Sequence, residues 1–175
     1  MGNTLDGWLR KTVELLRLLY DLLVEEVFAY SYLQADETTV PIMNQEKHKT
    51  EKKYLWMVRA VMGKLVIFHY DNGLRAGSVI ETLVGQYHFK GYFLCYDFVG
   101  YETAFKPHPD VWLVNCLAHI RRHFELALDE NREMAQYALT QIGHVYQIEL
   151  RCDEVGLTYD GRREKRQVQS RLSDR

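Results

Sequence analysis

The sequence is poor in the residues that mark several protein classes. Its three cysteines, Cys95, Cys116 and Cys152, are odd in number and widely spaced, so reduced thiols are expected rather than a disulfide framework. Only three prolines occur in 175 residues, and 47% of the residues are apolar, which excludes a disordered chain. The formal net charge is −2, so any contact with a polyanion has to come from a local patch.

Long hydrophobic runs and several catalytic loops are absent as well. The most apolar stretch, Leu15 to Phe28, is interrupted by charged residues, which argues against a membrane span and against a signal peptide. There is no glycine-rich phosphate loop, no Gly-x-Ser-x-Gly elbow and no His-Glu-x-x-His helix. P-loop, nucleophilic-hydrolase and zincin activities therefore lack a motif, and neither a membrane nor an organic cofactor is expected as a partner.

What the chain does contain begins with a predicted N-terminal helix that ends near Ala29. Its apolar residues recur at helical spacing and form one broad stripe: Leu5, Trp8, Leu9, Val13, Leu16, Leu19, Leu22 and Leu23. A stripe of this kind usually packs on the protein's own core, and it would equally suit a neighbouring domain.

The middle of the chain predicts short strands separated by turns. Strands are expected at 30–35, 54–60, 64–70, 92–96 and 111–116, and helices at 78–84, 118–128, 131–155 and 160–172. The polar, lysine-rich stretch 44–53 reads as an exposed loop. A β-hairpin followed by βαβ crossovers indicates an α/β fold with a mixed sheet of about five strands and flanking helices.

Two carboxylates lie where predicted strands end, and both are candidates for catalysis. Asp36 closes the first strand and Asp97 closes the fourth. Functional sites of open α/β sheets gather at the carboxyl ends of strands, although aspartate is also common there as a turn cap. Glu37 should point to the opposite face from Asp36, because side chains alternate along a strand, and it is left out of the set.

A third feature is the segment Cys116-Leu117-Ala118-His119-Ile120-Arg121-Arg122-His123-Phe124, which runs from a strand into a basic helix. Arg121 and Arg122 head that helix and can contact a phosphate, or they can form a solvated face. Cys116, His119 and His123 are ligand types that suit zinc, but a structural zinc site needs a fourth ligand. Residues 161–175 are also basic, which fits either a nucleic-acid contact or a solvated terminal helix.

Taken in order, these segments resemble the catalytic region of the insertion sequence 66 family of bacterial transposases. The matching pieces are Tyr32-Leu33-Gln34-Ala35-Asp36-Glu37-Thr38, Tyr54-Leu55-Trp56-Met57-Val58-Arg59, Phe68-His69-Tyr70 with Arg75, Phe89-Lys90-Gly91-Tyr92-Phe93-Leu94-Cys95-Tyr96-Asp97 with Gly100-Tyr101, and the Cys116 to Phe124 segment. The similarity extends over nearly the whole chain.

The resemblance implies a ribonuclease H-like fold with a long N-terminal helix (1–29), a partial catalytic core (30–128) and a helical extension (129–175). It implies that Asp36 and Asp97 bind two Mg²⁺ or Mn²⁺ ions and that DNA is cleaved and joined by direct phosphoryl transfer. His119, Arg121 and Arg122 would then contact double-stranded DNA at the transposon ends. A bacterial, cytoplasmic, nucleoid-associated protein is expected, and a homo-oligomer is compatible with it.

The sequence departs from the family pattern in one respect that bears on activity. The third acidic residue of such enzymes is a glutamate in an asparagine- and arginine-rich motif, and no third catalytic carboxylate of this kind is present in this chain. The interpretation is therefore a transposase core truncated at both ends and inactive by itself. The alternative is a non-catalytic DNA-binding or partner-binding remnant of a transposase.

Overall fold

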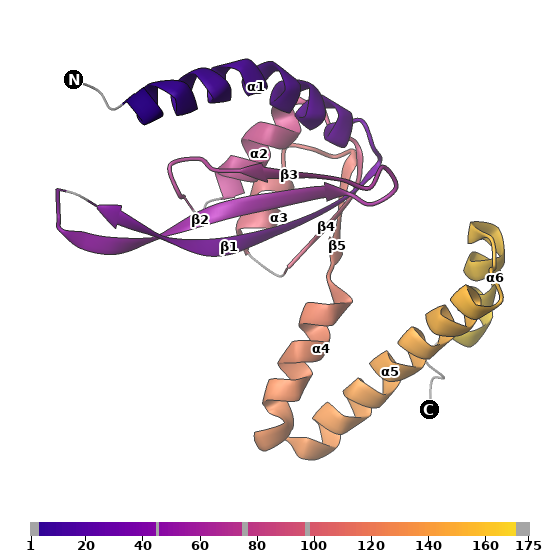
Figure 1. Cartoon of the computed structure of the whole chain (residues 1–175). Helices are drawn as coiled ribbons and strands as arrows, with labels where there is room; N and C mark the ends of the chain where they lie inside the picture. Colours follow the sequence, from indigo (N-terminus) through magenta and orange to yellow (C-terminus); the bar gives the residue numbers. More distant parts are fainter. Residues whose placement is uncertain (1–3, 45, 75–76, 97–98, 171–175) are drawn as a thin grey trace. The chain divides into compact units, whose positions relative to one another are not determined.

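The computed structural model of the chain describes residues 4–44, 46–74, 77–96 and 99–170. The chain divides into two compact units, Met1–Asn115 and Cys116–Arg175. The strands of the sheet belong to the first unit, and the helices α4 to α6 belong to the second (Figure 1). None of the described helices is both long and apolar enough to cross a membrane.

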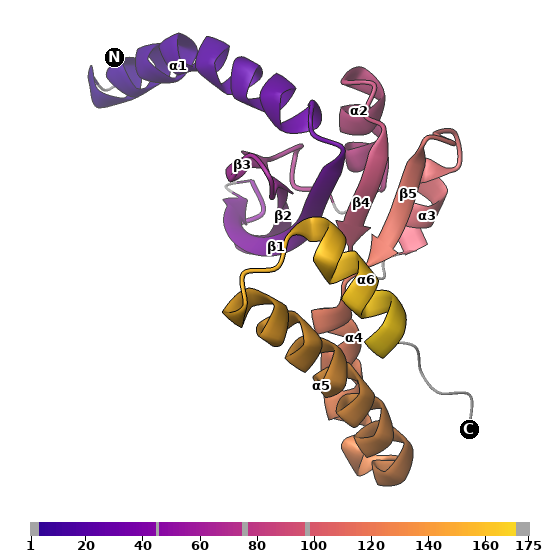
Figure 2. The ribbon, with the colours of Figure 1, turned by 90° about the vertical axis from the view of Figure 1, so that its right-hand side faces the viewer.

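The first unit is built on a mixed sheet of five strands in the order β3-β2-β1-β4-β5. The strands are β1 (Tyr32–Asn44), β2 (Lys49–Ala60), β3 (Leu65–His69), β4 (Gly91–Cys95) and β5 (Val111–Asn115). β1, β2 and β3 pair antiparallel, whereas β4 pairs parallel to both β1 and β5 (Figures 1 and 2). The predicted α/β fold, a ribonuclease H-like mixed sheet with a long N-terminal helix and C-terminal helices, is confirmed.

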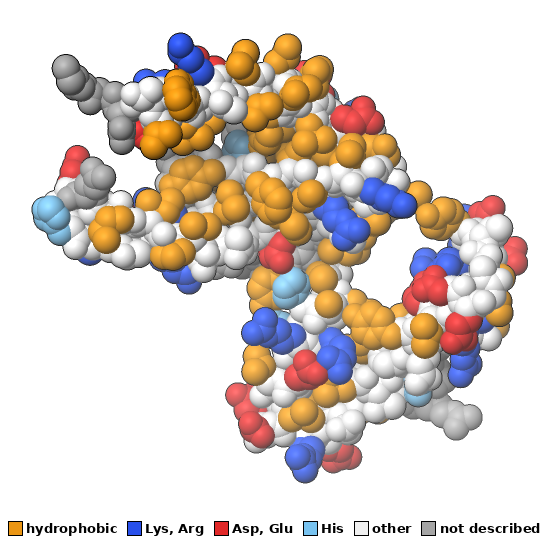
Figure 3. Space-filling model, in the orientation of Figure 1, with side chains coloured by type: hydrophobic (Ala, Val, Ile, Leu, Met, Phe, Trp, Pro, Cys, Tyr) orange, Lys and Arg blue, Asp and Glu red, His pale blue; other side chains and the backbone are white. Residues whose placement is uncertain are grey.

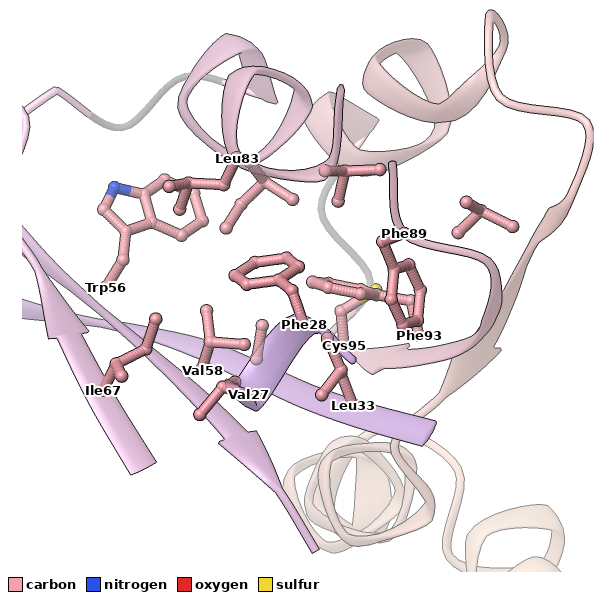
Figure 4. Packing of buried hydrophobic residues seen from close by; sticks show 14 of the residues in the cluster. Val27, Phe28, Leu33, Trp56, Val58, Ile67, Leu83, Phe89, Phe93 and Cys95 are labelled. Atoms are coloured by element: carbon pink, nitrogen blue, oxygen red, sulfur yellow. The ribbon is translucent and has the colours of Figure 1, made fainter. Parts of the chain in front are cut away.

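One face of the sheet carries the hydrophobic core. The helices α2 (Gly77–Gln86) and α3 (Val99–Phe105) follow β3 and β4, and their apolar side chains meet the buried side chains of the strands. Trp56, Phe93 and Tyr101 are the largest fully buried residues, and their rings contact one another edge-on or tilted. Figure 4 shows Trp56 and Phe93 among the packed residues, with Phe28 between them.

The predicted loop at 44–53 is wrong. β1 continues to Asn44 and β2 already begins at Lys49, so the two strands form a long antiparallel ribbon that pairs Asn44 with Lys49. The polar composition suggested a loop, but an antiparallel ribbon exposed to water does not need apolar side chains, because its backbone groups pair with each other. An ion pair between Lys47 and Glu51, at 2.9 Å, supports the turn.

The N-terminal helix, α1 (Thr4–Phe28), packs on the core only at its end. Val24, Val27 and Phe28 are buried, whereas every residue from Thr4 to Leu22 is exposed. The Tyr20 hydroxyl donates a hydrogen bond of 2.8 Å to the carbonyl oxygen of Phe68, which holds the helix against the edge strand β3. Within the first unit, most of the predicted apolar stripe therefore has no core to pack on.

The second unit is helical. It contains α4 (Leu117–Leu126), the short 3₁₀ helix η1 (Ala127–Asp129), α5 (Arg132–Glu154) and α6 (Tyr159–Gln169). α5 is followed by Gly156, whose φ of 62° is a left-handed conformation that glycine adopts without strain. α6 begins at Tyr159, one residue before the expected 160, and Thr158 caps it: the Thr158 hydroxyl accepts the N–H of Gly161.

Candidate functional site

Asp36 lies within β1, the central strand of the sheet, and not at the end of a strand as predicted, because β1 continues past it to Asn44. Alternation along the strand puts the buried Leu33 and Ala35 on the core face and Asp36 on the other face, where it is half-buried. Its cross-strand partner is Met57 of β2, which in turn faces Phe68 of β3. The carboxylate therefore lies on the face of the sheet opposite the core.

The neighbouring Glu37 points the other way, as the alternation predicted. Its carboxylate accepts a hydrogen bond of 3.1 Å from the hydroxyl of Tyr101, which belongs to α3 on the core face. Its backbone N–H donates to a carboxylate oxygen of Asp36 at 2.9 Å. Glu37 thus links Asp36 to α3. Its backbone N–H binds the Asp36 carboxylate, and its own carboxylate binds Tyr101 of α3.

Tyr101 is a residue next to the candidate site that the sequence did not indicate. Only 1% of its surface is exposed, and its ring packs against Trp56, Phe93 and Phe105. Burial, followed by the charge of Glu37, raises the pKa of Tyr101, so the phenol stays protonated and acts as a donor. The available signal was the aromatic pair Tyr101 and Phe105, four residues apart in the sequence.

The second predicted carboxylate, Asp97, lies outside the described residues. The strand before it is described: β4 runs parallel to β1, and Gln34 pairs with Leu94. Asp36 follows Gln34 by two residues, and β4 ends at Cys95, one residue past Leu94. The carboxyl end of β4 is therefore level with the part of β1 that carries Asp36.

The donor chemistry at this edge of the sheet fits a hard divalent cation. Carboxylate oxygens are the ligands that Mg²⁺ and Mn²⁺ prefer, and Asp36 offers them from a half-buried position on a paired strand. Among the described residues, no three histidine, cysteine, aspartate or glutamate side chains converge on one point to hold a metal. Asp36 and Asp97 would be the residues that hold such an ion.

The described residues do not support a zinc site at Cys116, His119 and His123. Cys116, His119 and His123 all lie in the described part of the second unit, and they do not form a metal-binding group. Cys116 precedes α4 with an extended backbone, φ −73° and ψ 112°, so its side chain does not share the helical spacing of the two histidines. Instead, Cys116 is the N-cap of α4, and the two histidines lie in the first two turns of this helix.

The predicted DNA-contacting residues His119, Arg121 and Arg122 all lie on α4. The Arg121 guanidinium forms an ion pair of 2.6 Å with Glu125 one turn later, and both side chains are nearly half-exposed. An exposed pair of this kind is weak, so the arginine can exchange its partner for a phosphate at little cost. Arg122 is exposed on the adjacent position.

The basic C-terminal segment is used largely inside the second unit. Arg166 binds both carboxylate oxygens of Glu149, at 2.5 and 2.6 Å, and Arg162 binds Asp153 at 2.6 Å. These contacts join α6 to α5. Two of the arginines that suggested a nucleic-acid patch are therefore structural cross-links between helices.

Comparison with known protein families identifies the family of the chain. No curated protein matches the sequence. The family described as Transposase IS66 family matches residues 1–174, which is essentially the entire chain. This match, over a five-stranded mixed sheet with Asp36 on its central strand, shows that the chain belongs to the IS66 family of transposases.

Proposed function

We propose that this chain is the core of an insertion-sequence transposase that acts on double-stranded DNA, with Asp36 and Asp97 as the carboxylates that hold divalent metal ions. The family supports an activity in transposition. The observation that carries the choice of residues is the position of Asp36 on β1, level with the carboxyl end of β4, from which the chain continues directly to Asp97.

The residues of the chain have separate roles in this proposal. Divalent ions held by paired carboxylates supply positive charge that makes a phosphodiester susceptible to displacement and stabilises the leaving oxygen. Asp36 presents its oxygens from a fixed strand, and the N–H of Glu37 orients one of them. Glu37 is itself fixed by Tyr101, so it acts in positioning.

Arg121, Arg122 and His119 are proposed to bind the DNA backbone. Arginine pairs strongly with phosphate oxygens, and both arginines are exposed on the second turn of α4. Such contacts do not read base sequence; they position the duplex.

We further propose that the chain by itself supplies two of three catalytic carboxylates and does not complete a cleavage reaction. The sequence contains no asparagine- and arginine-rich motif with a glutamate of the kind that the family resemblance implies. Metal binding and DNA binding would then be separable from strand cleavage.

The test measures these three properties on the entire chain. Mn²⁺ binding is followed by calorimetry, DNA binding by fluorescence anisotropy at several salt concentrations, and cleavage by plasmid nicking in Mg²⁺. Asp36→Asn is expected to weaken Mn²⁺ binding roughly 10- to 100-fold and to leave salt-dependent DNA binding intact. Asp129→Asn, at an exposed position of η1, is the matched control and should change neither.

Three results would count against the proposal. Mn²⁺ binding that is equal in the wild type and in Asp36→Asn would remove the assigned role of Asp36. DNA binding with no metal binding at all would favour the non-catalytic remnant instead. Plasmid nicking by the wild type that disappears in Asp36→Asn would show that the chain is complete as a nuclease.

A further inference from the structure

The ribbon formed by β1 and β2 continues beyond the rest of the sheet. β3 pairs with β2 only over residues 56–60, and β4 pairs with β1 only over residues 32–34. β1 and β2 pair with each other as far as Asn44 and Lys49. The outer part of this ribbon, residues 40–44 and 46–53, forms an arm. Each of its strands spans roughly 17 Å with no described strand along its outer edge, and the arm projects to the left of the sheet in Figure 1.

The arm contributes nothing to the hydrophobic core. None of its residues is buried, and Met43 is 62% exposed. Figure 3 shows hydrophobic and charged side chains on its surface. A two-stranded ribbon that packs on nothing is only marginally stable in water, so packing of the fold does not explain the length of the arm. Its surface is available to a ligand.

The charge of the arm is positive in a chain whose formal net charge is −2. It contains two glutamates, Glu46 and Glu51, and four lysines: Lys47, Lys49, Lys52 and Lys53. Glu51 forms ion pairs with Lys47, at 2.9 Å, and with Lys53, at 3.6 Å. Lys49 and Lys52 are exposed, and neither forms an ion pair within the described chain. These two ammonium groups can therefore pair with an anion from outside the protein.

The shape of the arm suits the major groove of duplex DNA. Two paired strands lie about 4.8 Å apart, and the major groove, about 12 Å wide, admits a two-stranded ribbon, whereas the minor groove is about half as wide. Ile42 and Met43, at 37% and 62% exposure, offer apolar surface for base edges such as the thymine methyl group. Lysines beside them can reach the phosphates that border the groove.

The arm is a direct continuation of the strand that carries Asp36. Val40 follows Asp36 by four residues, and it pairs with Lys53 of β2. Alternation along the strands starts Asp36, Lys53 and Lys49 from the same face, at intervals of roughly 13 Å. A duplex held along the arm therefore passes close to the Asp36 carboxylate.

We propose that the arm lies in the major groove of the duplex DNA on which this protein acts, with Lys49 and Lys52 bound to backbone phosphates. The arm thereby positions the duplex beside Asp36. This inference rests on the proposed function in one respect, that double-stranded DNA is the substrate of the site at Asp36. It adds a DNA contact in the first unit that is separate from the arginines of α4.

The first experiment compares two double variants of the entire chain for binding to a fluorescent DNA duplex at several salt concentrations. Lys49→Gln/Lys52→Gln should weaken binding on the order of 10-fold and reduce the slope of log K against log salt by about 2, one for each lost phosphate contact. Lys64→Gln/Lys106→Gln is the matched control. It removes the same charge from exposed positions of the first unit outside the arm, and it should change affinity by less than about 2-fold.

All four lysines are exposed, and circular dichroism checks that the variants are folded. Wild-type affinity and slope in Lys49→Gln/Lys52→Gln would overturn the inference. Equal losses in both double variants would also overturn it, because the effect would then follow net charge alone. The exposed lysines would in that case only keep the edges of the ribbon from pairing with other chains.

Further variants separate this inference from the proposed function. Weaker binding in Arg121→Ala/Arg122→Ala but not in Lys49→Gln/Lys52→Gln would overturn the role of the arm and leave the proposed function in place. Weaker binding in Lys49→Gln/Lys52→Gln, together with Mn²⁺ binding that Asp36→Asn does not change, would support the arm and reject the metal-binding role of Asp36.

A second experiment tests the groove by disulfide cross-linking to DNA. Cys95 and Cys152 are buried, so Cys116→Ser removes the remaining accessible thiol. Met43→Cys is prepared in this background, with Met62→Cys as the matched control. Met62 is 56% exposed and lies between β2 and β3, at the other end of β2 from the arm.

A duplex that carries a thiol tether on a base edge in the major groove should cross-link to Met43→Cys and not to Met62→Cys. Equal cross-linking of the two variants, or none with Met43→Cys, would overturn the placement of the arm. Preferential reaction of Met43→Cys with a tether in the minor groove would overturn it as well.

Discussion

The hydroxyl of Tyr101 donates a hydrogen bond to the carboxylate of Glu37 across 64 residues of sequence, at 3.1 Å. This contact ties β1, which carries Asp36, to α3, the helix that follows the end of β4. The phenol is almost fully buried, so the bond is formed in a low-dielectric environment where an unpaired partner is costly. It connects the two chain segments that carry the proposed metal-binding carboxylates.

Removing this hydroxyl should destabilise the first unit. Tyr101→Phe leaves the ring packing in place but removes the hydrogen bond from the buried phenol to the Glu37 carboxylate, which should cost about 1–3 kcal/mol of unfolding free energy. Urea denaturation measures the loss. Tyr137→Phe is the control, because Tyr137 is 63% exposed on α5, and it should change stability by less than about 0.5 kcal/mol. Equal effects of the two substitutions would contradict the assigned role of the bond.

Gly91 should not tolerate a side chain. Its φ is +133°, and a Cβ atom there would lie 2.1 Å from the carbonyl oxygen of Ser31. The backbone conformation alone should cost an alanine about 1–3 kcal/mol, and the clash with the neighbouring strand adds to this. Gly143→Ala is the opposite case: open space surrounds Gly143 in the interior of α5, so alanine should stabilise by about 0.5–1 kcal/mol. Thermal unfolding measures both changes: the melting temperature of Gly91→Ala should fall, and that of Gly143→Ala should rise.

The contact between α5 and α6 should be sensitive to acid. The hydrogen bonds from Arg166, followed by its charge, hold the pKa of Glu149 below its usual 4.5. An unfolded glutamate binds its proton at a higher pH than the paired one, so the stabilisation is complete above about pH 4.5 and is lost as the pH falls through the lower value. The chemical shift of the Arg166 Nε–H should therefore stay constant down to about pH 4.5 and change at lower pH, as Glu149 is protonated. A change of this shift already between pH 7 and 5 would contradict this pairing.

His69 should make the first unit less stable in mild acid. Burial lowers the pKa of His69 at the end of β3, with Asp71 opposing the effect. The unfolded chain then binds a proton at a higher pH than the folded one, so stability is complete above the usual histidine pKa of 6.5 and falls as the pH drops below it. The loss of unfolding free energy between about pH 8 and pH 5 should be smaller in His69→Gln. An unchanged pH dependence in this variant would assign the effect to another histidine.

The predicted strands show what local pattern conveys. The strands around Trp56, Phe93 and Leu113 were expected near the observed bounds, because apolar, β-branched and aromatic residues alternate there between turns. The first strand was expected to end at 35 and the second to begin at 54, so the continuation of β1 to Asn44 and the start of β2 at Lys49 were not expected. A mostly exposed ribbon leaves no hydrophobic pattern, and only cross-strand pairing reveals it.

By itself, the sequence determined the mixed α/β fold and the family, since both depend on residue order and local pattern. It placed Asp36 at the end of a strand, whereas the structure places it inside β1, the central strand. Tertiary structure alone decided which partner each polar group has. Glu37 binds Tyr101 and Arg166 binds Glu149 because folding brings together residues far apart in the chain. It also decided that most of the apolar stripe of α1 stays exposed, because only the end of the helix, at Leu23, Val24, Val27 and Phe28, packs on the core of the first unit.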